Sequence, residues 1–185
     1  ERRYDLFSAM PRPQPVAPLR TQESIEGVCD VFRFGGDGPA SLLIELPHGA
    51  TERAHFDAVA VKLESPLPAR LEQFFHVNTD FGVPELALEV AARLTGAARK
   101  ASAKGVVVVR ALVPRTFIDF NRVIGEGAQT GMTPGLQPYI TAPADRDLLL
   151  SLYQHYHATV ARLYLEACGA GDGIALTLHS YSPRS

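Results

Sequence analysis

The sequence lacks several features that mark whole classes of proteins. The chain of 185 residues has a formal net charge of −2, and no basic run is longer than Arg99 and Lys100. Nucleic acids and anionic membranes are bound through clustered lysine and arginine, so the charge pattern argues against both as partners. No stretch reaches the roughly 20 apolar residues that a membrane-spanning helix needs. Nothing in the sequence indicates an oligomeric state.

Cysteine is scarce as well. Cys29 and Cys168 lack metal-ligand spacing, and they could be two buried thiols or one disulfide. The chain begins at Glu1 without the apolar region of an export signal, so we expect a protein of the reducing cytoplasm. It has no initiator methionine and ends at Ser185 directly after a motif, so we expect a processed or incomplete chain.

Three well-known catalytic and nucleotide-binding motifs are missing. The glycines at 35–38 are not followed by the Lys-Ser/Thr pair of a Walker phosphate loop, so they predict a turn. Those at 125–135 do not have the GxGxxG dinucleotide spacing, and they predict either a mobile loop over a site or a plain surface loop. Ser180 lies outside a GxSxG elbow, which argues against a serine hydrolase.

The length fits one domain with one core, preceded by an arm. Four prolines between 11 and 18 cannot donate hydrogen bonds to a strand ladder, so we assign residues 1–22 to an extended Pro-rich arm. Residues 23–185 then form a single α/β domain. Strands are predicted at 27–34, 41–46, 106–109 and 174–178, and the first two could form a hairpin. The β-branched run at 106–109 suits a strand that is buried on both faces.

Helical spacing appears in three places. A short helix is predicted between 54 and 77, where Leu67, Leu71 and Phe75 recur. Pro84 opens a second helix with the apolar stripe Leu86, Val90, Leu94 and Ala97. The clearest helix covers 145–167, ends at Gly169, and has the stripe Leu149, Leu152, Tyr156, Val160, Leu163 and Ala167.

The most unusual chemistry follows the central strand. Arg115, Asp119, Asn121 and Arg122 alternate with large apolar residues, so charged groups that need partners lie next to core formers. Two guanidinium groups near an amide suit a substrate carboxylate, because arginine offers a planar fork for bidentate hydrogen bonds. The alternative is a structural Arg-Asp pair at a strand end.

Histidines follow two other strands. His48 comes after the strand at 41–46 and His179 after the strand at 174–178, which is where α/β sheets place ligands. Glu52 is close enough to His48 to share a metal, or it simply starts a helix. Asp80 lies in a loop, where it could bond its own backbone. On the long helix, His157 flanks the apolar stripe and fits a satisfied interface histidine.

Together these motifs resemble the N-formylglutamate amidohydrolase family, a branch of the zinc carboxypeptidase-like and aspartoacylase-like hydrolases. The matches occur in order along the chain: Pro47-His48-Gly49, Asn78-Thr79-Asp80-Phe81, Arg115 through Asp119 to Asn121-Arg122, Tyr156-His157, and Leu178-His179-Ser180. The resemblance implies a three-layer α/β sandwich with a largely parallel or mixed central sheet. It also implies metal-dependent hydrolysis of an N-acyl amino acid such as N-formylglutamate.

The resemblance further implies a zinc ion, or another divalent metal, bound by His48, His179 and one carboxylate, which would be Glu52 or Asp80. Such a metal lowers the pKa of its bound water to about 7.

Within the same resemblance, Asn121 and Arg122 hold the substrate carboxylate, and Arg115 polarises the scissile carbonyl. Relatives carry a general-base glutamate beyond the Leu-His-Ser strand, where this sequence ends. The remaining base candidates are His157 and whichever of Glu52 and Asp80 is not a ligand. The alternative function is a catalytically silent binding domain that keeps the carboxylate-binding arginines.

Overall fold

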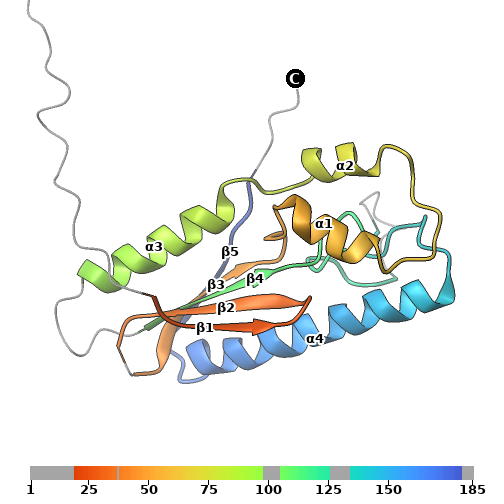
Figure 1. The fold of residues 1–185 in the computed structure, drawn as a ribbon. Coiled ribbons are helices and arrows are strands. Elements are labelled where there is room, and N and C mark those ends of the chain that lie inside the picture. Colours follow the sequence, from red (N-terminus) through yellow and green to blue (C-terminus); the bar gives the residue numbers. More distant parts are fainter. Residues whose placement is uncertain (1–18, 37, 98–104, 126–133, 181–185) are drawn as a thin grey trace, which may run out of the picture.

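The computed structural model of the chain describes residues 19–36, 38–97, 105–125 and 134–180. These residues form a five-stranded sheet in the order β1-β2-β4-β3-β5 (Figure 1). Strand β2 is antiparallel to β1 and β4, whereas β3 is parallel to β4 and β5. The sheet is therefore mixed. Its strands are β1 (Leu19–Ile25), β2 (Cys29–Phe34), β3 (Ala40–Leu46), β4 (Gly105–Ala111) and β5 (Ile174–Thr177).

Helices cover both faces of this sheet. Helix α3 lies along one face and α4 along the other, which gives the predicted three-layer α/β arrangement (Figure 1). Helices α1 and α2 contribute Phe56 and Phe75 to the core on the α4 side. The helices in the described residues are α1 (Arg53–Ala60), α2 (Leu71–Val77), α3 (Val83–Ala97) and α4 (Pro143–Cys168). The region between 54 and 77, where one short helix was predicted, therefore holds two.

Strand β4 is the buried centre that the valine run predicted. Successive side chains of a strand point to opposite faces, so its residues divide between two cores. Val107 and Val109 pack on the α4 side, while Val106 and Val108 pack on the α3 side. All four are at most 4% exposed. An apolar run in this position can be covered by helices on both faces without burying an unpaired charge.

Helix α4 follows its predicted pattern closely. The predicted stripe is buried except for Leu152, which is partly buried and packs against the same core. Gly169 caps the helix, and its backbone N–H donates to the carbonyl of Leu165.

Within the described residues both cysteines are free thiols, so the disulfide alternative is wrong. No helix among these residues is long and apolar enough to cross a membrane.

The predicted hairpin between 27–34 and 41–46 is wrong. Strand β4 lies between β2 and β3, so these two strands are not neighbours in the sheet. The hairpin is instead formed by β1 and β2, where Ile25 pairs with Cys29. Strand β1 starts at Leu19, inside the range that we assigned to the Pro-rich arm. The rest of that arm lies outside the described residues.

The predicted apolar stripe of α3 is wrong for two of its residues. Leu86 and Leu94 are 56% and 52% exposed. The buried face is formed mainly by small residues, because the sheet already presents large side chains there, including Phe32 and Phe34. A helix can approach such a face closely only with short side chains. The buried residues of α3 in this interface are Val83, Ala87, Ala91 and Ala92, and the partly buried Leu88 and Val90 pack beside them.

Candidate functional site

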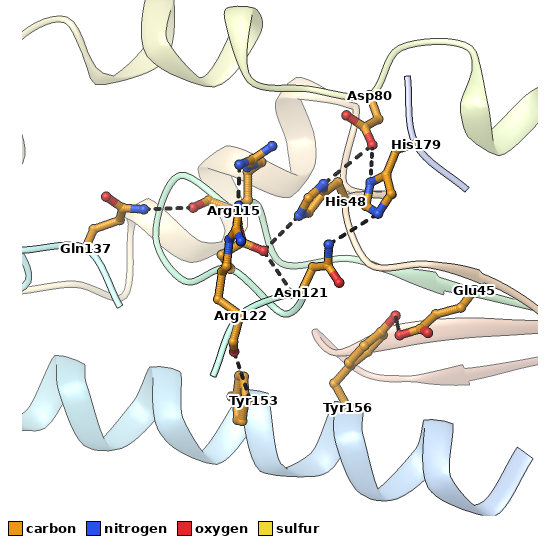
Figure 2. Close-up of polar contacts among 11 residues, drawn as sticks. Glu45, His48, Asp80, Arg115, Asn121, Arg122, Gln137, Tyr153, Tyr156 and His179 are labelled. Atoms are coloured by element: carbon orange, nitrogen blue, oxygen red, sulfur yellow. Dashed lines mark hydrogen bonds and ion pairs between the residues drawn. The ribbon is translucent and has the colours of Figure 1, made fainter. Parts of the chain in front are cut away.

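The candidate site lies at the edge of the sheet where three strands end together. Strands β3, β4 and β5 are parallel, so the segments that follow them meet at the same edge. His48 follows β3, the segment from Arg115 to Arg122 follows β4, and His179 follows β5. Asp80 enters from the loop between α2 and α3 (Figure 2).

Burial of apolar residues fixes the segment after β4. Phe117, Ile118 and Phe120 are at most 2% exposed and belong to the core on the α4 side. The backbone is held by neighbouring segments: Tyr153 on α4 donates to the carbonyl of Arg122 at 3.0 Å, and Gln137 donates to that of Arg115 at 3.3 Å (Figure 2). The alternation of apolar and polar residues therefore anchors the segment while its polar side chains face the site.

His48, Asp80 and His179 form a compact group of metal-ligand side chains. Oδ2 of Asp80 lies 3.0 Å from Nδ1 of His179 and 3.5 Å from Nδ1 of His48. One donor atom from each residue lies within 4.8 Å of the others. Two imidazoles and one carboxylate are a donor set that zinc accepts at about 2.0–2.2 Å from each ligand.

This group fits a metal in two respects. Nδ1 of His48 is buried and has no hydrogen-bond partner among the described residues, and it faces Asp80. A buried imidazole nitrogen without a partner is costly unless a ligand occupies it. The donor atoms around a zinc ion lie roughly 3–4 Å apart. The donor atoms of His48, Asp80 and His179, which lie within 4.8 Å of one another, would therefore move slightly closer together when the metal binds.

The second nitrogen of each ring is also held. Nε2 of His48 donates to Oδ1 of Asp119 at 2.8 Å. Nε2 of His179 lies 3.3 Å from the side-chain amide of Asn121, which carries both a donor and an acceptor. Metal-bound histidines are usually oriented in this way, by a polar group on the nitrogen that faces away from the metal.

Asp119 links the histidines to the arginines. Asp119 is 1% exposed, and its carboxylate accepts the backbone N–H of Asn121 at 2.9 Å. Oδ2 lies 3.3 Å from Arg115 Nη2 and 3.9 Å from Arg122 Nε. Burial alone would raise the pKa of Asp119, but the hydrogen bond from His48 and the charges of His48 and Arg115 lower it. Asp119 is therefore the ionised centre of the site.

The pKa values of the paired groups shift for the same reasons. Burial would lower the pKa of His48, but the hydrogen bond with Asp119 and the facing carboxylate of Asp80 outweigh it, so the pKa is raised. Burial would raise the pKa of Asp80, yet the facing His48 ring and the hydrogen bond with His179 lower it.

Glu52 lies outside this group of metal-ligand side chains. It is the N-cap residue of α1, where its backbone N–H donates to Nδ1 of His55 at 3.2 Å. Its side chain is 62% exposed and pairs with Arg110 at 2.9 Å. Asp80 is consequently the carboxylate that the structure brings to the two histidines. Of the two interpretations of Glu52, helix start is the one that matches its position.

His157 is also outside the metal-ligand group. Its ring packs against that of Tyr153, with centroids 4.1 Å apart, and against Tyr156 and Phe120. Burial lowers its pKa, against the charge of Glu45 and a backbone hydrogen bond with Phe120, which raise it. The structure therefore places His157 in an aromatic cluster between α4 and the segment after β4.

The sequence pattern did not reveal the role of Asp119 or of Arg110. The Arg-x-x-x-Asp spacing indicated only a pair with Arg115, whereas the structure joins Asp119 to His48 as well. Arg110 is part of β4 and binds the segment after His48. In the sequence, Arg110 differs from its neighbours only in being a charged residue at the end of an otherwise apolar strand.

Comparisons with known proteins support the fold alone. No family model matches the chain, and no curated protein matches it. Among solved structures, it is similar to N-formylglutamate amidohydrolase from Ralstonia eutropha JMP134, with a TM-score of 0.50 and 18% sequence identity. The match covers 83% of this chain and 62% of that one, so this chain spans less than two thirds of its neighbour. The chain therefore has a fold like that of an N-formylglutamate amidohydrolase.

Proposed function

We propose that this chain is a metal-dependent amidohydrolase that cleaves an N-acyl amino acid, with N-formylglutamate as the first substrate to test. One observation carries the proposal. The metal-ligand group of His48, Asp80 and His179 adjoins Arg115 and Asn121, and Asp119 joins the two sets. The likeness of the fold to an N-formylglutamate amidohydrolase supports the same reaction class.

His48, Asp80 and His179 would hold the metal, with Nδ1 of each histidine nearest to it. A zinc ion bound there supplies a Lewis acid and a water whose pKa is about 7. Asp119 and Asn121 keep the two rings in place through their outer nitrogens. A site prepared in this way needs little rearrangement when the metal binds.

The arginines would bind the anionic substrate. The side chains of Arg115 and Arg122 are 25% and 29% exposed. Each therefore contacts both solvent and the buried Asp119. Guanidinium groups that reach solvent can form bidentate hydrogen bonds with a carboxylate ligand. Arg122, with the amide of Asn121, suits the substrate carboxylate, and Arg115 suits the oxygen that becomes negative during acyl transfer.

One observation favours a second candidate, a binding domain without catalysis. Hydrolysis needs a group that moves protons, which contributes roughly 10²–10⁴-fold to the rate. In the part of the chain that the structure describes, both carboxylates of the site are occupied. Asp80 binds the histidines, and Asp119 binds His48 and Arg115. Neither is free to act as a base in this arrangement.

A paired binding and turnover measurement separates the two candidates. Zinc-loaded and metal-free protein are given N-formylglutamate, binding is measured by calorimetry, and formate release is measured enzymatically. The enzyme is supported if formate appears only with the zinc-loaded protein. Binding without formate release above the metal-free control supports the binding domain. Absence of both binding and turnover rejects both candidates.

The matched controls are two histidine variants. His48→Ala removes a member of the metal-ligand group, and His155→Ala removes an exposed histidine of α4 that lies outside it. We expect turnover to be lost in the first variant and retained in the second. Equal loss in both would indicate a general effect of the substitutions on folding.

A further inference from the structure

The loop that carries His48 has little regular structure of its own. It runs from the end of β3 at Leu46 to the start of α1 at Arg53. One backbone hydrogen bond, from Gly49 N to the carbonyl of Leu46 at 3.1 Å, closes the turn around His48. Asp119 holds the His48 ring but does not touch this backbone in the contacts of the described residues. The position of the loop must therefore come from another contact.

Arg110 supplies that contact. Its Nε donates to the carbonyl of Gly49 at 2.8 Å, and its Nη2 donates to Oγ1 of Thr51 at 3.3 Å and to Oε1 of Glu52 at 2.9 Å. A single guanidinium group thus binds three of the residues that follow His48. Its side chain is only 13% exposed.

The place of Arg110 in the sheet suits this role. It lies on β4, the central strand of the sheet, and pairs with Leu46 of β3 and Asp30 of β2. It is therefore beside the point where the chain leaves β3 and enters the loop. A side chain on a buried central strand is a more rigid support than one on another loop.

Gly49 shows how closely the loop and Arg110 are packed. A Cβ atom at this position would lie 2.6 Å from Cγ of Arg110 and 3.1–3.2 Å from the carbonyl oxygens of Leu46 and Ala111. Two of these three contacts are with backbone that cannot move aside easily. Glycine is needed here for space, so that the loop can lie against the guanidinium stem.

A plain ion pair between Arg110 and Glu52 does not account for these contacts. The Glu52 side chain is 62% exposed, and exposed ion pairs contribute little because water screens them. The bonds to the Gly49 carbonyl and to Thr51 do not involve Glu52. We propose that Arg110 is a positioning residue that sets the backbone of His48 for metal binding. This inference rests on the proposed metal site.

The first test compares zinc affinity by competition with a chelator. Arg110→Lys keeps the charge but cannot form the same three bonds, so we expect affinity to fall about 10–100-fold. Glu52→Gln keeps an acceptor but removes the ion pair, and we expect a change of less than about fivefold. Arg93→Lys, in an exposed pair with Glu89, is the matched control and should bind zinc like the unsubstituted chain. An equal loss in Glu52→Gln and Arg110→Lys would overturn the proposal in favour of a plain ion pair.

A second test does not need the metal. Hydrogen exchange of the amides at 48–52 is measured in metal-free protein, where we expect faster exchange in Arg110→Lys but not in Arg93→Lys. If Arg110→Lys does not fold, Thr51→Val removes one of the three bonds and should show a smaller increase in the same amides. Unchanged exchange in the folded variant would overturn the positioning role. Faster exchange in a chain that binds no zinc would leave that role standing and reject the proposed function.

Discussion

His48 and Asp119 are joined by a buried hydrogen bond of 2.8 Å although they are 71 positions apart in the chain. The bond connects the end of β3 to the segment after β4, and through Arg115 it extends to the candidate substrate side of the site. A substitution in the metal-ligand group should consequently alter ligand binding at the arginines, and a substitution at the arginines should alter metal binding.

Asp119→Asn should weaken zinc binding about 10–100-fold, because an amide holds the His48 ring less strongly than a carboxylate does. Competition with a chelator measures the change. Asp57→Asn, at an exposed pair with Arg53 on α1, is the control and should leave affinity unaltered. Undiminished affinity in Asp119→Asn would show that Asp119 does not orient a metal ligand.

His179→Ala should reduce zinc content below the roughly one ion per chain that a site with two histidines and a carboxylate predicts. Elemental analysis of purified protein provides the measurement. His155→Ala is the control, since His155 is exposed on α4. A full zinc content in His179→Ala would remove His179 from the site.

Arg122→Lys should weaken binding of N-acyl amino acids more than binding of the corresponding amides, because lysine cannot reproduce a bidentate fork. Calorimetric titration with each pair of ligands tests this, with Arg93→Lys as the control. If acid and amide lose the same affinity, Arg122 does not recognise the carboxylate.

Tyr156→Phe should destabilise the fold by about 1.5–3 kcal/mol, because the buried Tyr156 hydroxyl donates to the Glu45 carboxylate at 3.1 Å. The free energy of unfolding is obtained from urea titration. Tyr164→Phe removes a hydroxyl from a residue that is 50% exposed and should be near neutral. Similar losses in both variants would mean that the bond to Glu45 is not the cause.

Glu166→Gln should cost about 0.5–1 kcal/mol at neutral pH, because Glu166 receives two hydrogen bonds from Arg33 at a partly exposed site. The Arg33 hydrogen bond lowers the pKa of Glu166, so this stability is present above the unfolded pKa of about 4.3 and is lost as pH falls through the folded pKa. Urea titrations at pH 7 and pH 3 should show the gap between the two proteins closing in acid. A gap that is independent of pH would exclude the ion pair as its source. Glu89→Gln, in a more exposed pair, is the control.

Local patterns predicted the elements whose own residues carry a large apolar surface with the correct period. The valine run became the central strand, and the stripe of α4 faces the sheet, because each carries a large apolar surface with the correct period. Leu86 and Leu94 of the α3 stripe are exposed because the opposing face of the sheet is already filled by Phe32 and Phe34, which the helix sequence cannot reveal. The hairpin failed because β4, distant in sequence, separates β2 from β3.

The site, like the fold, could be predicted from the sequence only in part. The strand-end positions of His48 and His179 could be read locally, since strand ends are visible in the sequence. The choice between Glu52 and Asp80 stayed open in the sequence, because only the fold brings Asp80 to both histidines. The bond between Arg110 and the His48 loop likewise depends on the register of β3 and β4.

Strand β5 makes the site depend on a weakly held edge of the sheet. It has four residues, its only strand partner in the described part of the chain is β3, and Ile174 and Leu176 are 60% and 45% exposed. Short edge elements with few buried contacts open locally at a lower free energy than global unfolding. Fraying of β5 would draw His179 away from Asp80, so a ligand that requires both must work against that opening. Occupancy of the site and fraying of this edge are therefore thermodynamically coupled.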